Sequence, residues 1–206
     1  MFAGKTLWQI FASGGVTMYV LLFCSLLSLA VIIDRLWVYW SMRRVNRAAF
    51  MRRIQAQIER KDREGAIEVC RETNAPFARV ALAGLEARSR DEKLLASTLE
   101  RAVTVQASKL ERLTSIVGTI GNTAVYIGLF GTVLGIIRAF RDISAMGTGG
   151  MAIVIGGVAE ALITTATGLA VAVPSVIAYN YFVRRIDGFV NDMELCASEM
   201  TDLLTR

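Results

Sequence analysis

Three long apolar stretches alternate with charged segments along the 206 residues of this chain. The first runs from Val16 to Ile33 without a charge, and Trp37 and Trp40, whose rings suit a membrane interface, follow it directly. At 1.5 Å per residue, each stretch is long enough to cross a hydrocarbon core of about 30 Å as a helix. The pattern therefore predicts three transmembrane helices, at residues 16–40, 115–140 and 152–183.

The segments between these spans differ in length and character. Residues 1–15 and 141–151 are short, and we expect a short terminal segment and a short loop there, on the outer side of the membrane. Residues 41–114 are charged and alanine-rich, with a break at Pro76, which disfavours helix at the residue before it and can open a new one. Apolar residues recur at helical spacing before the second span and within 184–206, so both spans should continue as helices beyond the membrane. The first span is interpreted as a retained anchor, because no small-residue cleavage site follows it.

The distribution of arginine predicts the orientation. Five arginines follow the first span between residues 43 and 53, and Arg184 and Arg185 follow the third span. Basic residues collect on the cytoplasmic side, so residues 41–114 and the C-terminus should be cytoplasmic and the N-terminus periplasmic. Arg138 and Arg141, at the outer end of the second span, oppose this assignment but are outnumbered.

Composition excludes most other classes of protein. The chain is 54% hydrophobic, and its net charge of +5 fits the flanks of membrane helices better than a nucleic-acid surface. It has no histidine, which rules out Ser-His and Cys-His nucleophile pairs and the usual imidazole metal sites. Its cysteines, at positions 24, 70 and 196, are scattered and suggest neither a disulfide framework nor a metal site. We therefore expect a protein that is not an enzyme and that has no metal or other cofactor.

Small residues line one face of each of the last two spans. Such residues let helix backbones approach closely in a membrane. The predicted packing positions are Gly121, Gly128, Gly131 and Gly135 in the second span and Gly156, Gly157 and Gly168 in the third. We expect that one three-helix subunit cannot satisfy both faces, so that neighbouring copies supply the missing partners in a closed ring.

One carboxylate, Glu160, interrupts the third apolar stretch, in "VAEALITTATGLAVAVPSV" (158–176). It lies roughly 10 Å in from the outer end of the span, too deep to reach the headgroups easily. Intramembrane carboxylates tend to mark ion pathways, so one interpretation is a proton or cation relay. The other is a neutral carboxylic acid that holds helices together through a hydrogen bond to a threonine.

Two segments carry a resemblance to a known family. "GLFGTVLGIIRAF" (128–140) and "GGVAEALITTATGLAVAVPSVIAYNYFVRRI" (156–186) resemble the paired signature of the ExbB/TolQ/MotA proton-channel family, in order and spacing. Matched by position, Thr132 is the threonine of the G-T-V-x-G motif, Glu160 the glutamate of A-E-A-L and Thr165 the threonine five residues later. Glu160 points to the ExbB/TolQ branch, because MotA-type stators lack that acid. The family often has Pro-Gly where this chain has Gly156 and Gly157.

The resemblance implies an all-α integral membrane protein of the bacterial inner membrane, with three transmembrane helices and long cytoplasmic helical extensions. It implies a homo-pentameric ring in membrane lipid, with Thr132, Glu160 and Thr165 lining its interior. It also implies two copies, inside the ring, of an ExbD/TolR-like single-span partner whose membrane helix carries an aspartate, and a TonB/TolA-like protein as a further partner. On the same resemblance, we expect protons driven by the proton motive force to pass that aspartate and to power work in the cell envelope.

Two other functions stay open at this point. One is a scaffold that conducts no protons, with Glu160 as a structural hydrogen-bonding group. The other is an intramembrane enzyme, which the absence of histidine and of a paired aspartate signature disfavours. The sequence alone does not distinguish H⁺ from Na⁺, although the lack of further polar ligands near Glu160 favours H⁺. It also does not identify the process that is driven.

Overall fold

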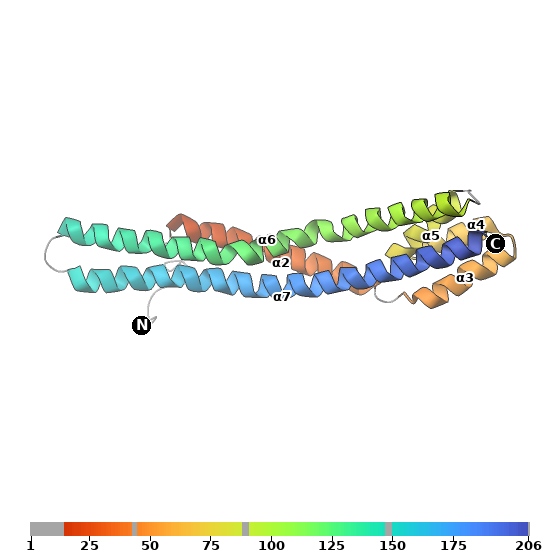
Figure 1. Cartoon of the computed structure of the whole chain (residues 1–206). Coiled ribbons are helices and arrows are strands. Elements are labelled where there is room, and N and C mark those ends of the chain that lie inside the picture. The colour runs from red at the N-terminus through yellow and green to blue at the C-terminus, as the bar shows by residue number, and fades with distance from the viewer. Residues whose placement is uncertain (1–14, 43–44, 88–90, 147–149, 206) are drawn as a thin grey trace. The chain divides into compact units, whose positions relative to one another are not determined.

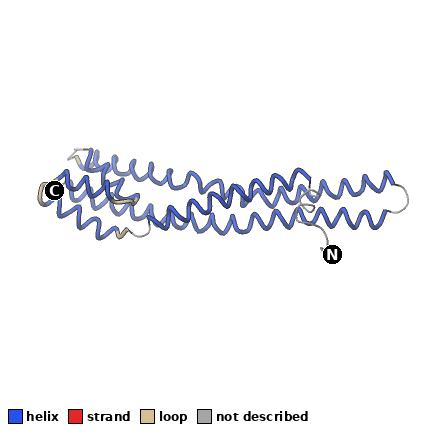
Figure 2. The backbone as a smooth tube through the Cα atoms, turned by 180° about the vertical axis from the view of Figure 1, so that it is seen from behind, coloured by secondary structure: helices blue, strands red, loops and turns tan. Residues whose placement is uncertain are grey.

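The computed structural model describes residues 15–42, 45–87, 91–146 and 150–205, and the predicted N-terminal segment 1–15 lies almost wholly outside them. Within these ranges the chain is helical and contains no strand (Figures 1 and 2). The helices are α2 (Gly15–Met42), α3 (Arg47–Glu59), α4 (Arg63–Glu72), α5 (Pro76–Glu86), α6 (Glu92–Met146) and α7 (Gly150–Thr205). The predicted all-α fold is confirmed.

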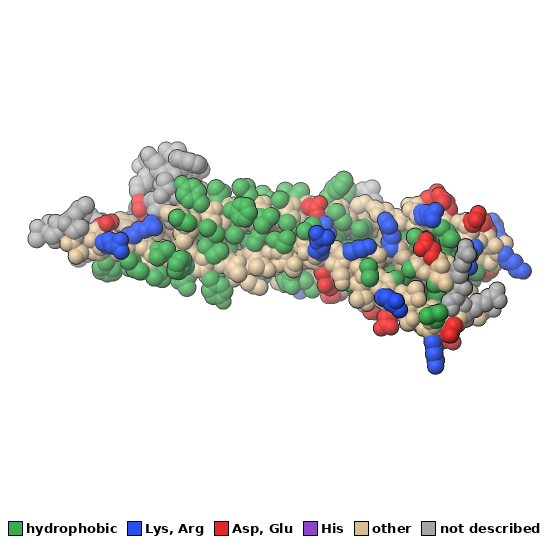
Figure 3. Space-filling model, turned by 90° about the horizontal axis from the view of Figure 1, so that it is seen from above, with side chains coloured by type: hydrophobic (Ala, Val, Ile, Leu, Met, Phe, Trp, Pro, Cys, Tyr) green, Lys and Arg blue, Asp and Glu red, His purple; other side chains and the backbone are tan. Residues whose placement is uncertain are grey.

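Three of these helices, α2, α6 and α7, are long and apolar enough to cross a membrane. Most of the residues in their most apolar windows are not buried inside the chain. Large side chains such as Phe23, Tyr126 and Ile177 are instead more than half exposed, as lipid-facing residues are. Figure 3 shows hydrophobic side chains gathered over one continuous stretch of the surface, with most charged side chains outside it.

The helices extend beyond the predicted ends of the spans. Helix α6 continues to Met146, six residues beyond the predicted end at 140, and α7 begins at Gly150. The predicted loop 141–151 is therefore mostly helix, and its centre, 147–149, lies outside the described residues. The loop was placed where polar residues begin, but a helix satisfies its own backbone hydrogen bonds and does not have to end where the apolar residues end. Toward the other ends, α6 starts at Glu92 and α7 runs to Thr205, so both helices continue beyond the apolar stretches as expected.

The chain divides into two compact units. The first contains residues up to Ile33 together with Ser115–Asn180, and the second contains Asp34–Thr114 together with Tyr181–Arg206. The second unit holds α3, α4, α5 and the polar parts of the three long helices.

Local sequence explains where the short helices of the second unit begin and end. Asn46 and Asp62 cap α3 and α4 by accepting hydrogen bonds from backbone N–H groups three residues later, at 3.2 and 2.9 Å. Pro76 opens α5, and Ala75 before it is extended, as predicted. Helix α3 ends in a Schellman motif whose left-handed residue is Lys61, at φ 59°.

Aromatic residues form much of the core of the second unit. Tyr39, 1% exposed, lies edge-on to Phe182 with 5.6 Å between ring centroids, and its hydroxyl donates to the carbonyl of Leu110 at 3.0 Å. Phe50 and Phe77 join α3 to α5 at 5.2 Å. Leu95, Leu99 and Ile186, which belong to the apolar faces that the sequence pattern predicted, are buried as well.

Candidate functional site

The first unit is held together by a close contact between α6 and α7. A methyl group added to Gly168 would lie 2.7 Å from the carbonyl oxygen of Ala124 and 3.0 Å from the Cα of Gly128. A methyl group on Gly135 would meet the Cβ of Ala161 at 2.6 Å. The backbones approach this closely only because side chains are absent, which is the usual basis of helix packing in membranes.

This contact corrects one prediction. The glycine face of the second span and the small-residue face of the third pack against each other within one chain, so they do not require a neighbouring copy. Gly156 has no described atom of this chain within 4 Å of a Cβ built on it, so its packing role stays a prediction. Helical periodicity identifies the face that packs but not the helix that receives it.

Thr132 of α6 and Thr165 of α7 meet inside this contact. Their hydroxyls share a hydrogen bond, and the Thr132 hydroxyl also lies 3.2 Å from the carbonyl oxygen of Gly128 and 3.3 Å from that of Ala161. The Thr165 hydroxyl lies 3.2 Å from the Gly128 oxygen. The structure thus brings together two of the three residues matched to the family motifs, in a polar pair across the α6–α7 contact.

Glu160 lies in a cavity of about 440 Å³ beside this pair. The cavity is formed by the start of α2, the last turns of the α6 span and the first turns of the α7 span. Its polar lining comprises Thr17, Arg138, Asp142, Glu160 and Thr164, and glycines 131, 135, 156 and 157 supply much of the rest. Thr132 and Thr165 do not line it.

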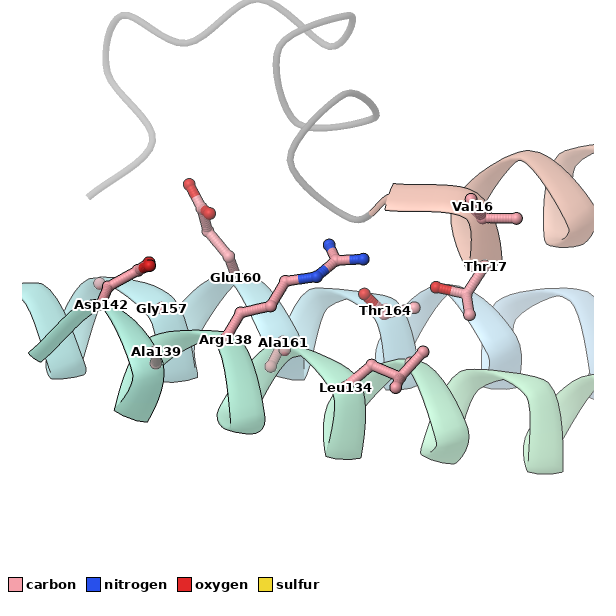
Figure 4. Close-up of a pocket in the computed structure, with 13 residues that line it drawn as sticks. Val16, Thr17, Leu134, Arg138, Ala139, Asp142, Gly157, Glu160, Ala161 and Thr164 are labelled. Carbon is pink, nitrogen blue, oxygen red and sulfur yellow. The ribbon is translucent and has the colours of Figure 1, made fainter. Parts of the chain in front are cut away.

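The charged side chains of the cavity share one side of the α6–α7 pair without pointing toward one another. Figure 4 shows the carboxylate of Glu160 and the guanidinium of Arg138 projecting to that side, with Arg138 directed toward the start of α2, where Thr17 lies. The guanidinium also lies against Gly15, since a Cβ there would come within 2.8 Å of its Nη1. Thr164, 1% exposed, is buried one turn of α7 from Glu160.

This arrangement gives the membrane-crossing unit a polar, hollow section. A carboxylate in a transmembrane segment is costly unless protein groups or water solvate it, and here a cation and hydroxyls share its cavity. Among the described residues no group of three histidine, cysteine, aspartate or glutamate side chains could hold a metal ion.

The sequence identified Glu160 but did not predict that Arg138, Asp142 and Thr17 would share its cavity. Arg138 was considered only as a charge that opposed the predicted orientation. A signal was present, because Arg138 and Asp142 follow Gly131 by 7 and 11 residues and so share the glycine face of α6. Nothing in the spacing of Thr17 indicated that α2 would close this cavity.

Comparison with known proteins agrees with this architecture. The profile of the MotA/TolQ/ExbB proton channel family matches residues 72–195. The chain belongs to this family. Within it, the chain is 31% identical to the biopolymer transport protein ExbB of Xanthomonas campestris pv. campestris over 185 residues, which cover 75% of this chain and 73% of the relative.

Two further relatives carry the two names of this branch, ExbB and TolQ. The biopolymer transport protein ExbB of Pseudomonas putida and the Tol-Pal system protein TolQ of Pseudomonas aeruginosa are each 39% identical over 112 residues, or 54% of this chain. The match spans about a third of the first relative and about half of the second. These relatives support the ExbB/TolQ branch, and a protein of this family with three apolar helices is a multi-pass membrane protein.

Proposed function

We propose that this protein is the proton-channel subunit of an energy-transducing complex of the inner membrane, of the ExbB–ExbD or TolQ–TolR kind. The observation that carries the proposal is Glu160, an acidic residue in a polar cavity of the membrane-crossing unit. In this proposal protons driven by the proton motive force exchange at its carboxylate, and no other cofactor takes part. The family match supports this activity.

The assembly belongs to the same proposal. A ring of five copies encloses two copies of a single-span partner whose membrane helix carries an aspartate, and a TonB- or TolA-like protein transmits the work. In this proposal residues 41–114 and the C-terminus are cytoplasmic and the N-terminus is periplasmic, an orientation that the arginine-rich flanks at 43–53 and 184–185 support. Because the glycine faces pack within one chain, they do not support the ring. The proposal of a ring is based on the family resemblance, and its contacts must come from other surfaces.

Glu160→Gln tests the proton role directly. Glutamine keeps the shape and the hydrogen-bonding capacity of the side chain but exchanges no proton. We expect Glu160→Gln to abolish complementation of a strain that lacks the chain, while the proposed single-span partner still co-purifies.

Asp142→Asn is the matched control, because it removes the other carboxylate of the same cavity. It should retain complementation at normal expression. Full complementation by Glu160→Gln would contradict the proton role and would favour the scaffold alternative, in which Glu160 is only a structural hydrogen-bonding group.

The threonine pair should matter less than Glu160. Thr132→Ala and Thr165→Ala each remove one hydroxyl from a contact in which carbonyl oxygens lie 3.2 to 3.3 Å away. Water can replace part of these hydrogen bonds, so each variant should reduce complementation without abolishing it. A complete loss with either variant, at normal expression and partner binding, would place an essential step of conduction at the pair.

A further inference from the structure

A second pocket, separate from the Glu160 cavity, lies within the second unit. It has a volume of about 340 Å³ and is lined by Leu36, Trp37 and Trp40 of α2 and by Tyr181 and Arg185 of α7. All five residues stand at the ends of apolar stretches, just after the run that closes at Ile33 and around the end of the third span at 183. The pocket thus belongs to the part of the helices where the bilayer meets water.

The aromatic side chains of this pocket are unusually exposed. Trp37 is 74% exposed and Trp40 is 59% exposed. Indole rings left open to water forgo a large hydrophobic stabilisation, whereas at the headgroup layer of a bilayer they contact both apolar and polar groups. Such exposure suits side chains that stand at this level of a bilayer.

The cation of the pocket lacks part of its hydrogen bonding. The Nε of Arg185 is buried and has no acceptor among the described residues. Arg35, near the tryptophans on α2, already has an anionic partner, since it pairs with Asp34 at 2.9 Å, and it lies over the ring of Tyr39. A buried donor without an acceptor is costly, so an anion that reaches the guanidinium would remove a penalty.

We propose that this pocket binds one anionic phospholipid. The phosphate pairs with the guanidinium fork of Arg185 after a rotation of its side chain, and the glycerol backbone and first acyl carbons lie on Leu36 and Trp37. A guanidinium matches two phosphate oxygens at once, which an ammonium cannot do. Basic pockets between membrane helices at the headgroup level are a known form of lipid recognition.

The test compares two lipids on the assembled full-length protein. Delipidated protein in non-ionic detergent is titrated with phosphatidylglycerol or phosphatidylcholine of identical acyl chains, and retained lipid is counted by native mass spectrometry. We expect phosphatidylglycerol to be retained about fivefold better, the preference that one cation near an anionic lipid provides. Arg185→Gln should bring the two lipids to equal retention.

Arg184→Gln is the matched control, because this neighbouring residue is exposed, does not line the pocket and carries the same charge. It should keep the preference for phosphatidylglycerol. An equal loss in both variants would mean that diffuse charge attracts the lipid, and this outcome would overturn the proposal. Displacement of the lipid by an equimolar amount of inorganic phosphate would likewise overturn it, in favour of a free-anion site.

Two further outcomes also decide the question. If Arg185→Gln changes the number of copies in the assembly and leaves lipid retention unchanged, the pocket is a contact between copies of this chain and the proposal fails. If Arg185→Gln does not fold, Trp37→Ala replaces it, because a residue 74% exposed can be truncated without disturbing the core. Trp37→Ala should lower phosphatidylglycerol retention, and unchanged retention would contradict the proposal.

Discussion

Replacing Gly168 with alanine should weaken the α6–α7 contact of the first unit. The new methyl group would lie 2.7 Å from the carbonyl oxygen of Ala124, and the next atoms, at 3.0 and 3.3 Å, belong to the backbone of Gly128. A flexible side chain could move away, but backbone atoms in the middle of a helix cannot. The two helices must therefore separate.

The structure sets the size of this effect. Ordinary contact begins at 3.4 Å, so relief of the 2.7 Å contact needs an opening of about 0.7 Å, enough to forfeit a quarter or more of the dispersion energy along the contact. The carbonyl oxygens of Ala161 and Gly128, now 3.3 and 3.2 Å from the hydroxyls of Thr132 and Thr165, would then lie beyond hydrogen-bonding distance. Overpacking costs about 1–3 kcal/mol and the loss of each interhelical hydrogen bond about 0.6 kcal/mol. We therefore expect the free energy of unfolding to fall by about 2–4 kcal/mol.

The assay is unfolding by dodecyl sulfate in mixed micelles, followed by circular dichroism. Gly188→Ala is the control, because Gly188 also lies inside α7 but has no described atom within 4 Å of an added Cβ. There alanine should stabilise the helix by up to about 1 kcal/mol. If Gly168→Ala unfolds at the same dodecyl sulfate fraction as the parent or at a higher one, the close contact between α6 and α7 does not exist.

Two further predictions concern the second unit. Lys61→Gly should raise the free energy of unfolding by about 1 kcal/mol in the same assay, because glycine adopts the left-handed conformation at φ 59° without strain, and a decrease would contradict this. Burial raises the pKa of Cys70 and of Cys196 from 9.0 to about 12, because the folded chain favours the neutral thiols. The stabilisation from these buried neutral thiols is therefore complete below pH 9 and is lost as pH rises from 9 toward 12. In a Cys24→Ser background at pH 8, a maleimide should label these thiols on the order of a hundredfold more slowly than in the chain denatured by dodecyl sulfate, and equal rates would refute their burial. Orientation in the membrane is better tested with a cysteine introduced at the exposed Ala48.

Much of the fold is predictable because its determinants are local. The length of an apolar stretch decides whether a helix can span the membrane, so all three spans were predicted. The break at Pro76 follows from the covalent structure of proline. The loop 141–151 was misjudged because polar residues mark the end of an apolar stretch and not the end of a helix.

For the site, too, local sequence determined one part and tertiary packing the other. The sequence alone singled out Glu160, because a carboxylate within an apolar run is costly wherever the helix packs. The tertiary structure decided which groups share its cavity, namely Arg138, Asp142 and Thr17, and it paired Thr132 with Thr165.

The physical reason is that helical periodicity determines the face on which a residue lies, whereas the partner of that face depends on packing. The glycine faces of α6 and α7 could have met a neighbouring copy or each other, and both choices have the same sequence pattern. Only the approach of the two backbones to contact distance decided that they meet within one chain. The sequence determined what each helix offers, and the tertiary structure determined what each helix contacts.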